Sequence, residues 1–283
     1  NRLHLWQEGN SFVLLSENKI DDSAVLLTPL EAMWGFPCPL IGPEAAEMLA
    51  ELLGQGRGEE NISSGHLMLC GLPDNRSAIH QLVRQVSRSH DAFLVEPTHR
   101  CVASLEGGVN GFLSRRSRKF RVNLQKALQR TQDQGICFRR ISIFDGNSCM
   151  QQYRRILAVE RRSWKGLSGN GIDRPPMKTF YRLMLRRIAP AGMLRLIMAE
   201  RDGRNIGYIY GAVIGKYYRG LQFSFDHRFA YLSPGNVLQY RMIEWLCEEG
   251  CRYYDLGSVV PYKKHWSELD HQTISVYLRR WQN

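Results

Sequence analysis

The sequence lacks the patterns that mark several large protein classes. Seven cysteines are spread along 283 residues without a CxxC pair, so neither a disulfide framework nor a metal site is predicted. No apolar run approaches the roughly 18–20 residues that span a bilayer, so no transmembrane segment is predicted. No GxGxxG or GxxxxGKS/T pattern follows an expected strand, which excludes the usual dinucleotide and P-loop sites.

Acidic residues are also scarce. The chain has 27 Asp and Glu against 38 Lys and Arg, a net charge of +11. This imbalance favours an anionic partner such as phosphate, a nucleotide, nucleic acid or an acidic membrane surface, without choosing among them. Free thiols favour a reducing compartment, so we expect a cytoplasmic protein, or one peripheral at the inner membrane face. The chain begins with Asn1, so a leader removed before it stays an open alternative.

The length allows two domains of ordinary size or one large domain. The patterns predict a mixed α/β protein whose second half contains an antiparallel meander, with a tight hairpin turn at Asp202 and Gly203. The expected helices are 44–53, 75–89, 111–134, 148–163, 178–188 and 234–249. The expected strands are 12–15, 24–27, 66–70, 92–95, 101–103, 136–144, 194–200, 206–214, 217–226, 252–257 and, at a sheet edge, 273–278.

The most basic segment, 111–134, is expected to form one amphipathic helix. At about 100° per residue, one narrow stripe of this helix, the basic stripe, consists of Arg115, Lys119, Lys126 and Arg130. No acid lies between Glu106 and Asp133 to neutralise it. A solvated helix face and an anion-binding surface are both compatible with this pattern. The stripe has no interleaved aromatic residue, which argues against single-stranded nucleic acid as the ligand.

A second anion site is predicted where the helix 234–249 begins. Ser233 is expected to cap this helix, and Pro234 at the first helical position gives up an N–H that had no partner. Gly235 allows another molecule to approach the backbone closely. Free N–H groups of the first turn and the positive end of the helix dipole then favour a phosphate. A well-capped helix without a ligand explains the same residues.

A series of motifs follows one another in a recognisable order. They are a helix with Glu160, then Trp164-Lys165-Gly166, Phe180-Tyr181-Arg182, the Asp-Gly hairpin, Phe225-Asp226, Leu232-Ser233-Pro234-Gly235, Tyr254-Asp255-Leu256-Gly257, Tyr262-Lys263 and Trp266. In this order they resemble the CelD/BcsL-type branch of the GNAT acyltransferase superfamily, which is related to the FemAB peptidyltransferases. The basic run from Arg115 to Lys119 also resembles the basic helix of that branch. The resemblance covers most of residues 110–270, and the first hundred residues only by position.

The resemblance implies tandem GNAT-like domains, each a mixed, mostly antiparallel sheet flanked by helices. A degenerate N-terminal domain would span 1–143 and include the basic helix, and a catalytic domain would span 144–283. In the superfamily, acyl-coenzyme A lies between two strands that splay apart, with its pyrophosphate on the N-terminus of the following helix. Acetyl-CoA or another acyl-CoA would then contact Phe225, Ser233, Pro234, Gly235, Asn236 and Val237. The superfamily signature (Arg or Gln)-x-x-Gly-x-(Gly or Ala) is absent, and FemAB-type relatives use aminoacyl-tRNA instead.

Acyl transfer needs a base for the attacking group, a donor for the oxyanion and a proton source for the leaving group. We expect Glu160 or Asp226 as the base, Lys263 to bind the carbonyl or a phosphate, and Tyr262 to protonate the leaving group. The expected substrate-binding residues are Trp164, Tyr181, Asp255 and Trp266. Each has a structural alternative: carboxylates that cap turns or pair with arginines, a surface lysine, and aromatic residues that pack in the core.

The leading hypothesis is an acyltransferase, specifically an N-acetyltransferase, that acts on an amine or hydroxyl of an acceptor related to envelope glycans or of a small molecule, as in polysaccharide biosynthesis. One alternative is a FemAB-like peptidyltransferase that uses aminoacyl-tRNA and contacts tRNA through the basic helix. The other is a non-catalytic binding protein that keeps the GNAT fold. The sequence leaves the acyl group, the acceptor and the oligomeric state open.

Overall fold

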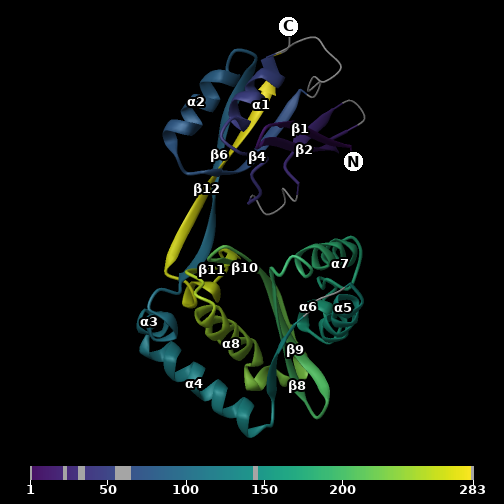
Figure 1. Cartoon of the computed structure of the whole chain (residues 1–283), viewed down its shortest axis with the longest axis vertical. Helices are drawn as coiled ribbons and strands as arrows, with labels where there is room; N and C mark the ends of the chain where they lie inside the picture. Colours follow the sequence, from purple (N-terminus) through teal and green to yellow (C-terminus); the bar gives the residue numbers. More distant parts are fainter. Residues whose placement is uncertain (1, 22–23, 31–35, 55–64, 143–145, 282–283) are drawn as a thin grey trace. The chain divides into compact units, whose positions relative to one another are not determined.

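The computed structural model describes residues 2–21, 24–30, 36–54, 65–142 and 146–281 (Figure 1). The chain divides into two compact units, Asn1–His99 with His271–Asn283, and Arg100–Asp270. The boundary expected between residues 143 and 144 lies outside the described residues. The division into a degenerate and a catalytic domain therefore stays a prediction.

The first unit is a sheet with two helices. Its strands lie in the order β1-β2-β3-β5-β12-β6, and β4 pairs with β2. The pair β3–β5 is parallel, whereas β1–β2, β2–β3 and β5–β12 are antiparallel. The two helices bury leucine and isoleucine side chains against the sheet in one core. The elements are β1 (Leu3–Glu8), β2 (Ser11–Lys19), β3 (Val25–Thr28), β4 (Leu40–Ile41), α1 (Ala45–Gly54), β5 (His66–Pro73), α2 (Arg76–Val86), β6 (His90–Ser104) and β12 (Leu269–Arg280).

Two predictions about these strands are wrong. The separate strands expected at 92–95 and 101–103 form the single strand β6, which continues through Pro97. The last strand, β12, lies between β5 and β6 rather than at an edge. A strand's place in a sheet depends on pairing with residues far away in the chain, which local patterns do not encode.

The second unit contains the longer sheet. Its strands lie in the order β6-β11-β10-β9-β8-β7, in which only β10–β11 is parallel among the pairs of the described residues. The expected hairpin joins β8 and β9, with positive φ at both Asp202 (49°) and Gly203 (71°), as a two-residue hairpin turn requires. The elements are α3 (Gly108–Ser114), α4 (Arg118–Asp133), β7 (Cys137–Ile141), α5 (Gly146–Glu160), α6 (Trp164–Leu167), α7 (Met177–Ile188), β8 (Leu194–Arg201), β9 (Arg204–Ile214), β10 (Tyr217–Phe225), η2 (His227–Leu232), α8 (Pro234–Glu248), β11 (Tyr253–Ser258) and η3 (Lys263–His265).

Helices cover both faces of this sheet (Figure 1). Alternate residues of β8 point to opposite faces, so Ile197 joins the core under α3, α4 and α8, and Leu196 joins the core under α5 and α7. Each unit therefore has a mostly antiparallel sheet flanked by helices, and each contains one parallel pair connected through a helix, β3–α1–β5 and β10–α8–β11. The expected mixed α/β fold is confirmed.

The prediction of one basic helix over 111–134 is wrong, because the segment forms α3 and α4. The break falls at Ser117, whose side chain caps α4 by accepting a hydrogen bond from the Phe120 N–H at 3.1 Å. Ser117 was not recognised as a cap because it lies within the basic run, whose pattern predicts one continuous helix. None of the helices in the described part of the chain is long and apolar enough to cross a membrane.

Candidate functional site

The most distinctive feature of the second unit is the separation of β10 from β11. The two strands pair in parallel at only three positions, the last joining Arg219 to Asp255. Each strand has a register shift just beyond that point, between Gly220 and Gln222 in β10 and between Asp255 and Gly257 in β11. Because such a bulge bends a strand, β10 and β11 diverge after this point. The later residues of each strand then have no pairing partner on the edge that faces the other strand.

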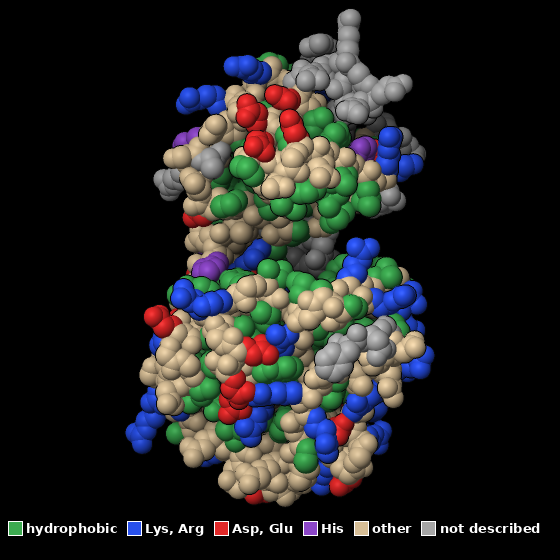
Figure 2. All heavy atoms as spheres, viewed as in Figure 1, with side chains coloured by type: hydrophobic (Ala, Val, Ile, Leu, Met, Phe, Trp, Pro, Cys, Tyr) green, Lys and Arg blue, Asp and Glu red, His purple; other side chains and the backbone are tan. Residues whose placement is uncertain are grey.

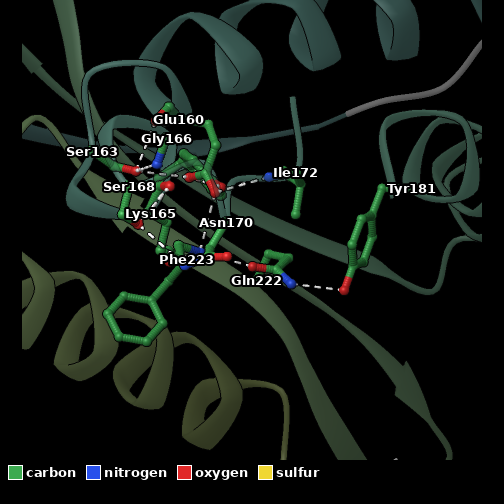
Figure 3. Close-up of polar contacts among 11 residues, drawn as sticks. Glu160, Ser163, Lys165, Gly166, Ser168, Asn170, Ile172, Tyr181, Gln222 and Phe223 are labelled. Atoms are coloured by element: carbon green, nitrogen blue, oxygen red, sulfur yellow. Dashed lines mark hydrogen bonds and ion pairs between the residues drawn. The ribbon is translucent and has the colours of Figure 1, made fainter. Parts of the chain in front are cut away.

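A buried ionic cluster lies on the face of the sheet that α5 and α7 cover (Figure 3). The Glu160 side chain is fully buried at the end of α5. Its carboxylate accepts hydrogen bonds from the Tyr208 hydroxyl at 2.8 Å and the Ile172 N–H at 3.2 Å, and lies 3.4 Å from Lys165 Nζ. Burial, and next the Glu160 carboxylate, hold the pKa of Tyr208 well above its usual value. The hydroxyl is therefore a permanent donor to Glu160.

Lys165 connects this cluster to β10. Its Nζ donates to the Gln222 side-chain oxygen at 2.9 Å and to the Phe223 carbonyl at 3.1 Å, and Gln222 donates in turn to the Tyr181 hydroxyl at 2.7 Å (Figure 3). Phe223 lies beyond the last β10–β11 pair, so the ammonium group occupies the edge of β10 where the strands have separated. Burial lowers the pKa of Lys165, although the Glu160 carboxylate opposes this.

A second lysine lies on the other separated strand. Lys263 Nζ donates to the carbonyl of Ser258, the last residue of β11, at 3.1 Å. Burial, and next the positive charge of Arg219, lower the pKa of Lys263. The neighbouring Tyr262 ring packs edge-on against Phe223 with centroids 6.1 Å apart. Burial raises the pKa of Tyr262 to about 12, so its hydroxyl stays protonated at neutral pH.

The two aspartates expected near the site are held by arginines. The buried Asp226 carboxylate accepts hydrogen bonds from Arg162 at 2.7 Å and Arg228 at 2.7 Å. Burial acts to raise the pKa of Asp226, but these hydrogen bonds outweigh it and lower the pKa to about 2. Asp255 is buried as well and binds Arg219 at 2.7 Å and the Gly257 N–H at 2.7 Å. These contacts anchor the ends of β10 and β11.

The start of α8 differs in one respect from the expectation. Ser233 is at the N-cap position, but it has a left-handed conformation (φ 56°) and its side chain makes no capping hydrogen bond, so the predicted side-chain cap is wrong. Instead, an Arg130 nitrogen lies 3.5 Å from Ser233 Oγ. The Gly235 N–H has no acceptor among the described residues, whereas the Asn236 N–H is bonded to the Ser233 carbonyl at 3.1 Å.

Packing within the protein also requires glycine at position 235. A Cβ at this position would lie 2.9 Å from the Phe225 ring, which is closer than real Cβ contacts allow. Pro234 and Val237 are buried beside it, and Asn236 is exposed. The first turn of α8 therefore packs closely on Phe225, and Asn236 is its exposed residue.

The remaining predicted residues are dispersed. Trp164 is 58% exposed, and Tyr181 is buried with its hydroxyl on Gln222. Trp266 is buried between Phe112 and Phe120, with ring centroids 6.2 and 4.8 Å away. The structure thus gathers Glu160, Tyr181, Tyr262 and Lys263 around the separated strands, together with Lys165 and Gln222. None of the contacts described for this group involves Asp226, the start of α8 or Trp266.

Sequence reasoning missed Lys165, Gln222 and Tyr208 as site residues. For Lys165, the signal was the pairing of a capping residue, Ser163, with a glycine three positions later. In the structure Ser163 caps α6, and a Cβ at Gly166 would lie only 2.2 Å from the Glu160 carbonyl oxygen. This tight turn folds Lys165 back beside Glu160. For Gln222, the signal was a polar side chain in the middle of an aromatic strand. Tyr208 gave none, since its role depends on the pairing of β9 with β10.

Comparisons with known proteins agree with this geometry. A family model for the acetyltransferase (GNAT) domain matches residues 118–264. The structure of FemX is 12% identical, covers 96% of this chain and 88% of its own, and gives a TM-score of 0.65. The structure of L-PGS from Bacillus licheniformis is 11% identical, covers 100% of this chain and 85% of its own, and gives 0.62. No curated protein sequence matches the chain.

At these low identities the likeness shows the fold alone. That fold is a tandem-GNAT fold, as the sequence predicted, because both solved structures match along nearly the whole chain. The separation of two parallel strands beside a helix N-terminus lies inside the matched domain.

Proposed function

The chain belongs to the acetyltransferase (GNAT) family, and we propose that it transfers an aminoacyl group from aminoacyl-tRNA to an amine or hydroxyl of an acceptor. The observation that carries this proposal is the gap between β10 and β11, which has a half-buried lysine on each side. Lys165 holds the Phe223 carbonyl and Lys263 holds the Ser258 carbonyl. The ammonium group of Lys263 makes its side of the gap positive where an ester carbonyl would develop negative charge.

Three observations support aminoacyl-tRNA as the donor. The tandem fold matches FemX and L-PGS along nearly its whole length, and the resemblance implies that FemAB-type relatives use aminoacyl-tRNA. The sequence signature of the coenzyme A-binding loop is absent. The net charge of +11 suits a polyanionic donor.

The proposed chemistry follows from the protonation states. The acceptor nitrogen or oxygen attacks the ester carbonyl of the aminoacyl group, and the bond from that carbonyl to the ribose oxygen breaks. Lys165, whose pKa burial lowers, takes the proton of the attacking group in its neutral form. Tyr262 donates a proton to the leaving ribose oxygen, and Lys263 binds the carbonyl oxygen. Glu160 acts through Lys165 as a positioning residue, because its carboxylate is fully buried.

Asp226 is a poor choice of base in this scheme. A carboxylate with a pKa of about 2 takes up protons weakly at neutral pH. We therefore assign Asp226 and Asp255 to the support of the strand ends, and Tyr181 to the orientation of Gln222. All of these residues lie in 144–270, which supports the proposed catalytic domain 144–283.

Transfer from acetyl-CoA is the second candidate, and the start of α8 favours it. The Gly235 N–H has no acceptor among the described residues, and Arg130 lies beside Ser233. Both are suited to a pyrophosphate. In either case we infer an acceptor related to envelope glycans, as the CelD/BcsL-type resemblance implies.

A pair of binding and transfer measurements tests the proposal. The chain is incubated with tRNA charged with labelled amino acids, or with labelled acetyl-CoA, and with a panel of amino sugars and peptides as acceptors. We expect label to move from tRNA, and Lys165→Met to slow the transfer by roughly 10²–10⁴ while Lys178→Met, at an exposed position of α7, preserves it. Transfer from acetyl-CoA alone would establish the second candidate instead. Absence of transfer from both donors, with no binding of either, would refute an enzymatic role.

A further inference from the structure

A cavity of about 420 Å³ lies in the first unit, among the end of α2, the start of β6 and the end of β12. This volume lies within the range of roughly 300–1,000 Å³ that is typical of small-molecule sites. The first unit supplies none of the residues of the transfer site. The cavity has one histidine, one ion pair and two aromatic rings in its wall: His90, Asp91, Phe93, Arg279 and Trp281.

The two aromatic rings of this cavity are open to solvent. Phe93 is 45% exposed and Trp281 is 51% exposed. Both are held in place by the fold. The Phe93 ring packs against Tyr277 with centroids 5.9 Å apart, and the backbone N–H of Trp281 donates to the Ser89 carbonyl at 3.1 Å. Fixed and exposed apolar surfaces inside a cavity favour a ligand that has an apolar face of its own.

The charged groups of the cavity neutralise each other. The Arg279 guanidinium donates to one oxygen of the Asp91 carboxylate at 2.9 Å, and the Trp281 indole N–H donates to the other at 3.0 Å. These hydrogen bonds, that from Arg279 first, lower the pKa of Asp91, so the carboxylate is ionised at neutral pH. Arg279 also lies over the Phe93 ring, 5.3 Å from its centroid. A charged ligand would therefore have to compete with an ion pair that is already formed.

His90 adds a buried polar group to the wall. It is 3% exposed, and its Nδ1 shares a hydrogen bond with the Ser89 hydroxyl at 2.8 Å. Its Nε2 has no hydrogen-bond partner among the described residues. Burial, and next the positive charge of Arg280, lower the pKa of His90, so the ring is neutral at neutral pH. Nε2 is then a donor or an acceptor according to the tautomer, and a ligand hydroxyl satisfies either.

The charge of the first unit also argues against an anionic ligand. In this unit Asp and Glu outnumber Lys and Arg, so the positive surplus of the chain lies in the second unit. On the face drawn in Figure 2, Lys and Arg side chains are denser over the second unit than over the first. A purely apolar ligand would leave His90 Nε2 without a partner. The wall therefore suits an uncharged ring with an apolar face and several hydroxyl groups.

We propose that this cavity binds an uncharged pyranose sugar, either free or as a unit of a glycan. The C–H groups on one face of the sugar ring pack on Trp281 and Phe93, because these groups carry partial positive charge and aromatic faces are negative. The sugar hydroxyls bond with His90 Nε2 and with the Asp91 carboxylate, whose oxygens each have acceptor capacity left. The site holds a carbohydrate without reacting with it. It is independent of the donor used at the transfer site.

Binding to the full chain is measured by saturation-transfer NMR and by calorimetry. The probes are methyl α-glucopyranoside, N-acetylglucosamine and maltose, with glucosamine and glucuronate as charged counterparts of the same ring. We expect the uncharged sugars to bind and the charged ones to bind more weakly. Tighter binding of maltose than of the monosaccharides would identify a unit of a glycan as the ligand, and equal binding would identify a free sugar.

Variants of the two rings test the geometry. Trp281→Ala and Phe93→Ala each remove one aromatic face, and we expect each to weaken sugar binding roughly tenfold. Trp281→Phe keeps an aromatic face and should retain most of the affinity. The matched control is Leu94→Ala, because Leu94 is 67% exposed and lies on the opposite face of β6 from Phe93. It should bind as the wild type does, and thermal unfolding checks that every variant is folded.

Three results would overturn this site. They are the absence of a signal from every uncharged sugar in large excess, an equal loss of binding in Leu94→Ala, and tighter binding of glucosamine or glucuronate. Self-association of the chain that Trp281→Ala abolishes, without sugar binding, would instead identify a contact between copies and also refute the proposal. Because no acyl donor is present in these measurements, a failure of the transfer reaction leaves their outcome unchanged.

Discussion

Asp226 offers a quantitative test of whether the carboxylates of the site act as bases or as anchors. In the folded chain its pKa is lowered from 3.8 to about 2. A difference of about 1.8 units, at 1.36 kcal/mol per unit, corresponds to about 2.4 kcal/mol of stabilisation of the native state. Arg228, one of the two partners, is 59% exposed, and solvent screening reduces its share. We therefore expect the ionised Asp226 carboxylate to contribute about 1–2 kcal/mol to the free energy of unfolding.

The sign of the pH dependence follows from the lowered pKa. The contribution of Asp226 is complete above its ordinary pKa of 3.8 and is lost as the pH falls toward 2. Urea unfolding at pH 7 should show that Asp226→Asn destabilises the protein by at least this amount, because Arg162 then loses a charged partner. Between about pH 4 and pH 2, the wild type should lose stability faster than the variant.

A matched control is Asp202→Asn in the β8–β9 turn. Asp202 is 90% exposed, and asparagine also accepts the positive φ that this position requires. We expect this variant to have the stability and acid sensitivity of the wild type. If Asp226→Asn were equally stable at pH 7 and its acid profile ran parallel to that of the wild type, the anchoring argument would be wrong, and Asp226 would be available as a base.

The other predictions concern the lysine, the start of α8 and the aromatic core. Because burial lowers the pKa of Lys165, transfer should rise with pH as this lysine loses its proton, and Lys165→Met should lower kcat by roughly 10²–10⁴ and remove that rise in a pH–rate profile. Gly235→Ala should destabilise the chain by about 1–3 kcal/mol in denaturant unfolding, because its Cβ would meet the Phe225 ring at 2.9 Å; an unchanged midpoint would contradict that packing. Trp266→Ala should cost about 3–5 kcal/mol, as for other buried aromatic residues, and a loss of activity without loss of stability would instead favour a role in substrate binding.

Local patterns predicted those parts of the chain that local physics controls. The Asp-Gly turn between β8 and β9 follows from two residues that tolerate positive φ. Helix α8 begins at Pro234 and ends just before Gly250, as its terminal residues indicate. The order of motifs also indicated the family, since the GNAT domain match covers 118–264. Among the site residues, Glu160 and Lys263 were named from the same order of motifs and from the groups that acyl transfer needs.

Tertiary structure decided which of these groups meet. The pairing of β9 with β10 places Tyr208 opposite Ser224 and so within reach of Glu160, and no local pattern encodes that register. The tight turn at Gly166 returns Lys165 to the edge of β10, where the pairing with β11 has ended. The sequence by itself determined most of the elements, the charge balance and the family, because these depend largely on neighbours in the chain. The cluster around Lys165 depends on residues some 60 positions apart (from 160 to 223), and only the folded sheet brings them together.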